Sequence, residues 1–455
     1  MFFESFTKTN LTKYTMKLKP LFTVFFICIL FLSCEKGSSD LITSNTNPTQ
    51  NDTLKGPGAT KGSGLLPVDY VAQLGKGFDV TWAEFSKYMD LFNEQVVIDF
   101  HEAGFTNVRI RVQDEDLGPD FISMLKGQVD FCLAHNIYPI IAYQGHYIED
   151  TATSDADAKD HLTTWWRKLA LEFKDYSENL TFNIMVEISG TYKKNYTAIN
   201  DFYASALSAI RESNPKRIVI FPPVNLSNPD YLQYLQLPKD KYTMVEWHFY
   251  AAGPTKDSTN KKYWNDGSTA QERANITDPI NTAVNWMQQT GYVTWVGAWM
   301  AGNYNKGNDF DIPAQVAFAS FMTRSLDAYN IPWSVNAGNK YYDYANNVWF
   351  TETPDAAGIP VRDVILDPDA IGLYDGDNYA GNAFRLSEGN YTLSDLQSIG
   401  INQDNIKSIM VPFDFKVELY TEDNFGGTKM TYTTTSKGLT GTIGSIKVVN
   451  LHSYN

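Results

Sequence analysis

The chain has 455 residues, of which 43% are apolar, and its formal net charge is −15. This length is enough for about two or three domains with a sizeable core. The acidic balance argues against nucleic acids and other anionic polymers as partners, because these need a basic surface. Aromatic residues make up 14% of the chain, and aromatic faces suit neutral sugars, although aromatic side chains also fill protein cores.

Residues 1–34 have the pattern of an export signal. Basic residues precede a 12-residue apolar run, Leu21 to Leu32, which is too short for a stable membrane-spanning helix. Ser33 and Cys34 follow, and this arrangement resembles a bacterial lipobox, in which the cysteine is lipidated after cleavage. We therefore expect an exported lipoprotein of the outer membrane or cell surface, held to the membrane through its lipid anchor only. The alternative is an ordinary secretory signal.

The next segment, residues 35–66, is rich in Ser, Thr, Asn, Pro and Gly, which predicts a flexible linker. Cys28 leaves with the signal and Cys34 becomes the anchor, so Cys132 is the cysteine expected to remain as a thiol. It lies in an apolar helical pattern, which predicts burial. Neither a disulfide nor a zinc site made of cysteines is expected.

Strands and helices alternate through residues 67–365. The predicted strands are 77–81, 106–112, 138–144, 180–187, 217–221, 243–250, 293–299 and 331–336. The predicted helices are 95–103, 121–135, 158–176, 198–213, 280–290 and 315–329. Eight strands that alternate with helical crossovers predict a (β/α)8 barrel, which is a TIM barrel.

The fourth predicted strand ends in a carboxylate, Glu187, after a run of large apolar residues that begins near Leu180. An unpaired buried carboxylate costs several kcal/mol or changes its pKa, so such a strand does not take a charge without a reason. A carboxylate at the C-terminal end of a barrel strand is typical of a catalytic group. The alternative is a glutamate that is ion-paired at a strand end.

Further polar and aromatic side chains follow the other strand ends, where a barrel of this class collects its chemistry. They are Arg109 on the second strand, Gln144 and His146 after the third, Glu246, His248 and Tyr250 on the sixth, Trp299 on the seventh and Trp333 on the eighth. This convergence exceeds what core packing requires. The histidines and glutamates lack a metal-ligand spacing, and the chain has neither a phosphate loop nor a serine-esterase motif. We expect no cofactor for catalysis.

Several of these segments are similar to glycoside hydrolase family 5, the cellulase-type barrels of retaining β-glycanases. The similarity runs from Gly75 to about Pro360. Arg109 lies in a Val-Arg-Ile segment and so matches the family's arginine beneath the nucleophile. The strand that ends near Glu187 resembles the one that carries the acid/base, and the His-Phe-Tyr segment at His248 resembles the family's His-x-Tyr motif.

The chain also departs from the family pattern. Val186 and Ile188 replace the Asn and Pro around the acid/base, and Ala298 occupies the position of the strand-seven nucleophile. A methyl group cannot form a glycosyl-enzyme ester. The best second carboxylate is Glu246, as base or nucleophile beside the acid Glu187. The alternative is that Glu246 lies low in the barrel, ion-paired with an arginine of the second strand.

The resemblance implies a hydrolase of a β-linked polysaccharide. The residues expected to bind substrate are Arg109, Gln144, His146, His248, Tyr250, Trp299 and Trp333. A second class stays open, namely a catalytically impaired surface protein that only binds glycans. The retained Arg109 and Glu187 favour the hydrolase, whereas Ala298 and Val186 favour the binding protein.

Residues 368–455 change to short strands with Gly, Asn and Asp turns. Tyr374–Gly381 recurs as Tyr420–Gly427, and both copies read aromatic-x4-aromatic-x-Gly. This repeat resembles a βγ-crystallin domain, so we expect a small all-β domain of two Greek keys. Glycine suits the folded hairpin backbone that other residues resist.

The βγ-crystallin resemblance also implies calcium. Asp404, Asn405 and Ser408 match most of that family's calcium motif, and oxygen ligands suit Ca²⁺. The second copy keeps only Ser445 of this motif. We therefore predict one weak Ca²⁺ site, and the alternative is a turn capped by Asp404.

Overall fold

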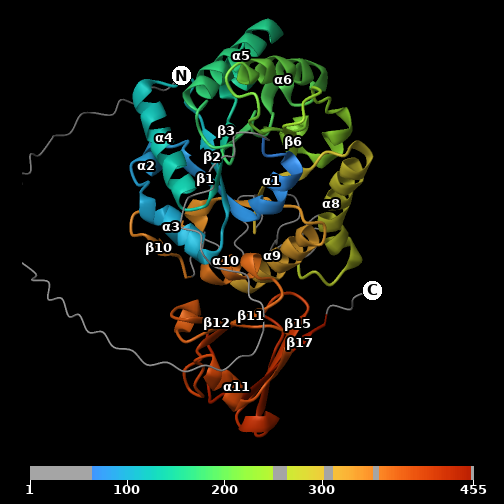
Figure 1. Cartoon of the computed structure of the whole chain (residues 1–455). Helices are drawn as coiled ribbons and strands as arrows, with labels where there is room; N and C mark the ends of the chain where they lie inside the picture. The colour runs from blue at the N-terminus through green and yellow to red at the C-terminus, as the bar shows by residue number, and fades with distance from the viewer. Residues whose placement is uncertain (1–63, 250–263, 302–310, 352–357, 452–455) are drawn as a thin grey trace, which may run out of the picture. The chain divides into compact units, whose positions relative to one another are not determined.

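The structure is a computed structural model that describes residues 64–249, 264–301, 311–351 and 358–451 (Figure 1). The predicted export signal with Cys34, all but the end of the predicted linker, and Tyr250 lie outside these residues. Within the described ranges, no helix is long and apolar enough to cross a membrane.

Eight parallel strands close into a barrel in sequence order, which confirms the predicted TIM barrel. They are β1 (Lys76–Ala83), β2 (Asn107–Val112), β3 (Tyr138–Tyr143), β4 (Thr181–Asn183), β5 (Val219–Phe221), β6 (Thr243–Phe249), β7 (Thr294–Trp299) and β8 (Trp333–Asn336). The barrel closes where β1 pairs with β8, from Lys76 opposite Trp333 to Asp79 opposite Asn336. Strands that are buried on both faces need nearly continuous apolar runs, which explains their sequences.

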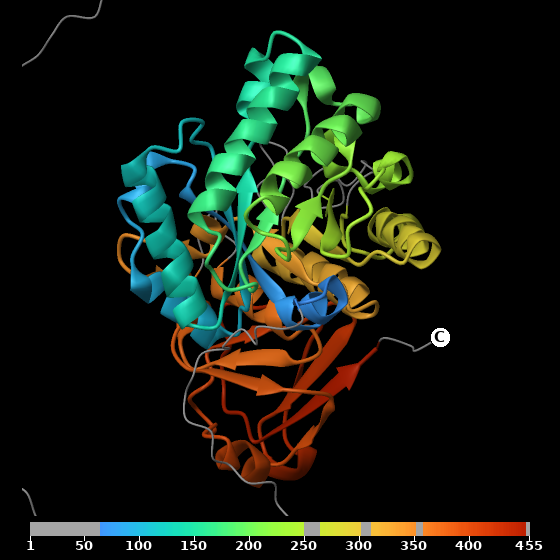
Figure 2. The same cartoon turned by 45° about the horizontal axis from the view of Figure 1, so that its top comes forward.

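Helices surround these strands (Figure 2). The longer ones are α1 (Pro67–Leu74), α3 (Glu94–Ala103), α4 (Pro119–Ala134), α5 (Asp155–Glu172), α6 (Tyr196–Arg211), α8 (Ala270–Thr290), α9 (Ile312–Asp327) and α10 (Gly358–Leu366). Shorter elements in the connections are α2 (Ser86–Met89), η1 (Tyr147–Thr151), η2 (Gly190–Tyr192), α7 (Val224–Ser227), η3 (Pro229–Tyr234), η4 (Gly338–Lys340), β9 (Tyr342–Asp343) and β10 (Val348–Trp349).

Several predicted boundaries were wrong, and those of α8 and β4 have a clear physical reason or consequence. Helix α8 begins ten residues before the predicted start at 280, because Thr269 and Glu272 form a capping box there. Pro279 lies inside the helix. Strand β4 ends at Asn183 rather than at Glu187. The chain keeps one backbone contact with β3 beyond this point, from the Val186 N–H to the Tyr143 carbonyl at 2.9 Å.

The region after residue 368 forms two antiparallel sheets. The strands are β11 (Ile371–Tyr374), β12 (Ala383–Leu386), β13 (Gly389–Tyr391), β14 (Ser408–Met410), β15 (Phe415–Tyr420), β16 (Lys429–Tyr432) and β17 (Ser445–Asn450), with η5 (Asp377–Tyr379), α11 (Leu393–Ser398) and η6 (Asp423–Phe425) between them. One sheet has the order β12-β11-β14 and the other β13-β17-β15-β16, so β13 joins the sheet made otherwise by the second half of the region. Both sheets contribute to one apolar core.

The sequence repeat of this region has a matching repeat in the backbone. Asn378 and Tyr379 of the first copy have φ angles of 54° and 65°, and Asn424 and Phe425 of the second have 55° and 65°. In the first copy the Ser408 hydroxyl accepts a hydrogen bond from the Tyr379 N–H at 2.9 Å. The same bond, from the Phe425 N–H to the Ser445 hydroxyl at 2.8 Å, closes the second copy.

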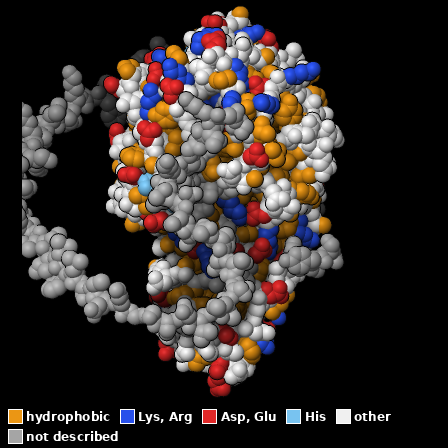
Figure 3. Space-filling view, viewed as in Figure 1, with side chains coloured by type: hydrophobic (Ala, Val, Ile, Leu, Met, Phe, Trp, Pro, Cys, Tyr) orange, Lys and Arg blue, Asp and Glu red, His pale blue; other side chains and the backbone are white. Residues whose placement is uncertain are grey.

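Charged side chains are mixed over the surface. On the face shown in Figure 3, the described Lys and Arg side chains are interspersed with Asp and Glu rather than gathered into a stripe.

Candidate active site

Glu187 lies in a tight turn just beyond β4. Its backbone has a φ of 51°, in the left-handed region that non-glycine residues seldom adopt. The turn is fixed by a hydrogen bond from the Leu226 N–H to the Ile188 carbonyl at 3.0 Å. The Glu187 side chain is 35% exposed, which makes it the most accessible member of the charged network described below.

His248 of β6 connects Glu187 to the interior of the barrel. Its Nδ1 is 2.7 Å from Glu187 Oε1, its Nε2 is 2.9 Å from Glu246 Oε1, and its side chain is 1% exposed. Burial lowers the pKa of His248, but the two carboxylates outweigh burial and hold the pKa above its ordinary value of 6.5. Burial raises the pKa of Glu187, whereas the hydrogen bond and charge of His248 bring it below 4.5. Both changes favour the charged pair, with His248 protonated and Glu187 ionised.

Arg109 of β2 neutralises the buried carboxylates of this network. It donates to Asp79 of β1 from two atoms, Nε to Oδ1 at 3.0 Å and Nη2 to Oδ2 at 2.8 Å. Its Nη1 is 3.4 Å from Glu246 Oε1. Burial raises the pKa of Asp79, but the charges of Arg109 and Arg111 hold it below its ordinary value. Each buried carboxylate in this network thus has a cationic neighbour.

Arg111 extends the network toward the surface. Its Nη2 is 2.8 Å from Glu84 Oε2, and its Nε is 3.3 Å from Asp79 Oδ1. The predicted substrate residue Gln144 is buried and donates from its side chain to Glu84 Oε1 at 2.8 Å. Burial raises the pKa of Glu84, and the charge of Arg111 opposes this effect only in part.

Gly297 of β7 makes room for the buried groups. A Cβ atom at this position would lie 2.7 Å from His248 Nε2, 3.0 Å from Arg109 Nη1 and 3.0 Å from Glu246 Cδ. These three side chains therefore rest directly against the backbone of β7. The next residue, Ala298, which the sequence resemblance matched to the nucleophile position, is fully buried.

Glu246 lies where the alternative for this residue placed it. The side chain is 0% exposed and is ion-paired with Arg109 and His248. The imidazole of His248 separates it from Glu187, so the two carboxylates do not face each other across open space. Its second oxygen, Oε2, has no hydrogen-bond partner within the part of the chain that the structure describes.

The other predicted substrate residues that the structure describes do not join this network. His146 is exposed at the start of η1. Trp299 and Trp333 are fully buried, and their rings pack edge to face with centroids 5.4 Å apart. Trp299 also packs against Phe318 of α9, on the helical layer. Contact with a sugar needs an accessible ring, so the substrate contact expected of these two tryptophans does not fit their buried positions.

Sequence reasoning missed several groups near the site, among them Asp79, Glu84, Glu149 and Gly297. Asp79 carries the same signal that singled out Glu187, a charge inside an apolar strand. Glu149 of η1 is buried and accepts hydrogen bonds from the Ser189 N–H and, at 2.6 Å, from the Ser189 hydroxyl, which supports the turn at Glu187. Gly297 gives no such signal, because its role depends on side chains of other strands.

The predicted calcium ligands are engaged in hydrogen bonds with other residues. Asp404 Oδ1 accepts from the Thr442 hydroxyl at 2.9 Å, and Asn405 Oδ1 accepts from the Asn402 N–H at 2.9 Å. The Ser408 hydroxyl is buried and donates to the Gly376 carbonyl at 2.7 Å. The described residues contain no group of three or more His, Cys, Asp or Glu side chains that could hold a metal ion.

The closed parallel barrel, with charged side chains gathered inside it and at its strand ends, defines a protein of the (β/α)8 class. The particular family follows from comparison. The chain belongs to glycosyl hydrolase family 5, because the family's cellulase model matches residues 72–339.

Relatives of this family agree with the assignment. The chain is 22% identical to endoglucanase A of Clostridium longisporum over 228 residues, which are 45% of this chain and 44% of that protein. It is 26% identical to endoglucanase H of Acetivibrio thermocellus over 221 residues, 45% of this chain and 24% of that protein. The match thus spans less than half the length of either relative.

Solved structures show the same fold. A broad-specificity endoglucanase from Clostridium longisporum superposes with a TM-score of 0.57 at 18% identity, over 67% of this chain and 99% of that chain. Another endoglucanase gives a TM-score of 0.56 at 22% identity, over 66% of this chain and 99% of that chain.

Proposed function

We propose that this protein binds a β-linked polysaccharide across the C-terminal ends of the barrel strands and hydrolyses it, with Glu187 at the scissile bond. The observation that carries the proposal is the position of Glu187, a partly exposed carboxylate in contact with a buried, charge-compensated network. Membership of family 5 and the likeness to endoglucanases support a glycan substrate.

The proposed acid step uses His248 as the proton source. Glu187 is ionised in the resting ion pair, so it must gain a proton before it can act as an acid. The His248 Nδ1 proton moves to Glu187 Oε1 over 2.7 Å as Glu187 protonates the leaving oxygen and the bond from that oxygen to the anomeric carbon breaks. A water molecule then adds to the anomeric carbon, and the proton that it loses returns through Glu187 to His248. Glu246 stabilises His248 from the opposite ring nitrogen, and Arg109 keeps Glu246 in place. In this scheme Glu246 is a positioning residue.

A second function, glycan binding without cleavage, is favoured by a specific observation. Two-carboxylate hydrolysis needs the carboxyls about 5–5.5 Å apart for retention or about 6.5–9.5 Å apart with room for a water between them for inversion. Here Ala298 cannot act as a nucleophile, and the buried Glu246 faces an imidazole rather than open space.

Reducing-end assays with the full chain on β-glucan and β-mannan distinguish the two functions. Hydrolysis predicts new reducing ends from the wild type and a loss of about 10²–10⁴-fold in Glu187→Gln. Glu212→Gln is the matched control, because Glu212 forms an exposed ion pair with Arg167. Retention of glycan by both proteins without any new reducing ends would contradict hydrolysis and support the binding protein.

The export and C-terminal predictions also remain proposals. We infer that Cys34 carries a lipid anchor; the apolar run before it supports this, and loss of membrane association in Cys34→Ser tests it.

We also infer that residues 368–455 are a βγ-crystallin-like domain of two Greek keys. The matched hairpins and the placement of β13 in the sheet of the second copy support this inference.

A further inference from the structure

A hollow of about 390 Å³ lies outside the charged network, between the connections that follow β4 and β5. Its lining residues are Lys194, Tyr196, Asp230, Tyr231, Gln233 and Tyr234. Both connections leave the C-terminal ends of their strands, which is the end where Glu187 lies. The volume is within the range of about 300–1,000 Å³ that is typical of small-ligand sites.

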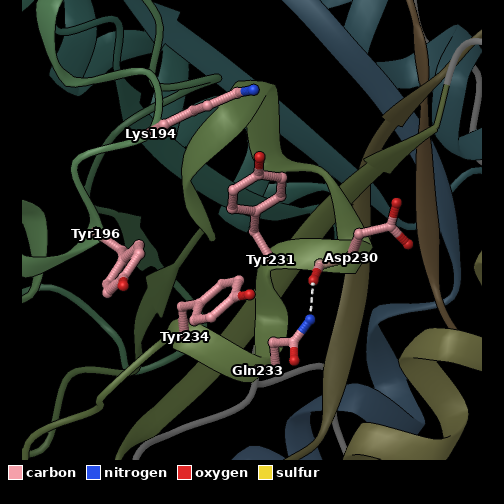
Figure 4. Close-up of a pocket in the computed structure, with 6 residues that line it drawn as sticks. All are labelled: Lys194, Tyr196, Asp230, Tyr231, Gln233 and Tyr234. Carbon is pink, nitrogen blue, oxygen red and sulfur yellow. Dashed lines mark hydrogen bonds between the residues drawn. The ribbon is translucent and has the colours of Figure 1, made fainter.

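Aromatic rings dominate this hollow. Tyr196 and Tyr234 are stacked, with ring centroids 4.7 Å apart and an interplanar angle of 14°. Their side chains are 40% and 39% exposed. The centroid of Tyr231 lies 5.8 Å from that of Tyr234, and Figure 4 shows the three rings gathered in one group.

Hydrogen bonds hold these two connections together. The side chain of Asn200 on α6 donates to the Tyr234 carbonyl at 2.9 Å and accepts from the Gln236 N–H at 3.0 Å. The Gln233 side chain donates to the Asp230 carbonyl at 2.9 Å. The rings therefore project from a fixed frame, so little conformational entropy is lost when a ligand binds.

The chemistry of the hollow fits a neutral sugar. The C–H groups on one face of a β-linked pyranose can lie against the negative face of an aromatic ring. Hydroxyls around the sugar can meet the tyrosine hydroxyls, the Lys194 amine and the Asp230 carboxylate. The charges of Lys194 and Asp230 are opposite, so the hollow favours neither an anionic nor a cationic ligand.

We propose that Tyr196, Tyr231 and Tyr234 form a binding subsite for neutral β-linked glycan chains, separate from the network around Glu187. The subsite rests on the proposed function, since it would hold the same polysaccharide that reaches Glu187.

Binding of cellohexaose tests this subsite, measured by calorimetry with the full chain in a Glu187→Gln background that prevents turnover. Tyr196→Ala and Tyr234→Ala are each expected to weaken binding by about tenfold, and Tyr234→Phe to retain most of it. Tyr329→Ala is the matched control and should bind unchanged. Tyr329 is 45% exposed and precedes β8, at the opposite end of the barrel.

The outcomes separate this inference from the proposed function. Unchanged binding in both alanine variants, with thermal midpoints equal to that of the control, overturns the subsite even if the wild type releases reducing ends. Weaker binding in both variants supports the subsite even if the wild type releases no reducing ends, a result that overturns hydrolysis alone. Absence of any cellohexaose binding, in every variant and also with mannohexaose, overturns the subsite.

Discussion

Two sets of strands contribute different chemistry to the barrel. Strands β1, β2 and β6 place Asp79, Arg109, Glu246 and His248 inside it. Strands β7 and β8, which lie between β6 and β1, contribute Gly297, Ala298, Trp299 and Trp333. The first set is therefore rich in charge, whereas the second is apolar.

This difference shows that the charged network needs no carboxylate from β7. Glu246 supplies a buried negative charge beside Arg109 and His248, and Gly297 leaves the volume that this arrangement needs. Each buried carboxylate thus has a cationic neighbour, and the partly exposed Glu187 is the most accessible carboxylate of the network.

The largest expected effect comes from removing the central cation. Arg109→Ala leaves Asp79 and Glu246 buried without their shared partner, which should reduce the free energy of unfolding by about 3–5 kcal/mol. Urea denaturation measures this change. Arg167→Ala is the control, because its exposed pair with Glu212 should contribute only about 0–1 kcal/mol. Equal losses in both variants would contradict the proposed importance of the buried network.

A smaller effect is expected where Gly297 of β7 contacts the buried charged side chains. Gly297→Ala adds a Cβ 2.7 Å from His248 Nε2, so the buried side chains must move, at a cost of about 1–3 kcal/mol. Gly127→Ala is the control, since nothing lies within 4 Å of its added Cβ. Urea denaturation of both variants gives the comparison, and a Gly297→Ala protein as stable as the wild type would show that β7 does not confine the network.

The pH dependence of stability tests the ion pair between His248 and Glu187. The raised pKa of His248 contributes stability that is fully present below pH 6.5 and is lost as the pH rises through the pKa of the folded state. The lowered pKa of Glu187 contributes stability that is present above pH 4.5 and is lost as the pH falls through its folded-state pKa. The difference in thermal midpoint between the wild type and Glu187→Gln should therefore be largest between these values. A difference that grows above pH 8 would contradict the ion pair.

The smallest effect concerns calcium in the C-terminal region. If Asp404 binds Ca²⁺, a concentration about ten times Kd would add about 1.4 kcal/mol to stability and raise the thermal midpoint. Asp404→Ala would remove this increase, whereas Asp375→Ala, which changes a carboxylate bonded to Asn382, would keep it. A thermal midpoint that does not change with Ca²⁺ would remove the proposed site.

The sequence predicted the barrel well because alternating strands and helices have strong local patterns. The structure also brings together Arg109, Glu187 and His248, which the sequence singled out. The aromatic residues were harder, because Trp299 and Trp333 look alike in sequence whether they face a cleft or the helical layer. Only the packing against Phe318 shows that Trp299 faces the helices.

The burial of Glu246 could not be read from its spacing to His248. Residues of one parity face one side of a strand, but parity does not tell how deep each lies in the barrel. The contact with Arg109 and the close approach to Gly297 depend on the register of three different strands. The sequence did not predict the hollow lined by Tyr196, Tyr231 and Tyr234 for a related reason, since its residues come from two connections that are distant in sequence.

Gly297 also limits which substitutions β7 can accept. While Glu246 and His248 occupy the space beside it, any larger residue there would collide with them. A larger side chain at this position would fit only together with smaller residues on β6. The effect of a substitution at Gly297 therefore depends on which side chains β6 carries.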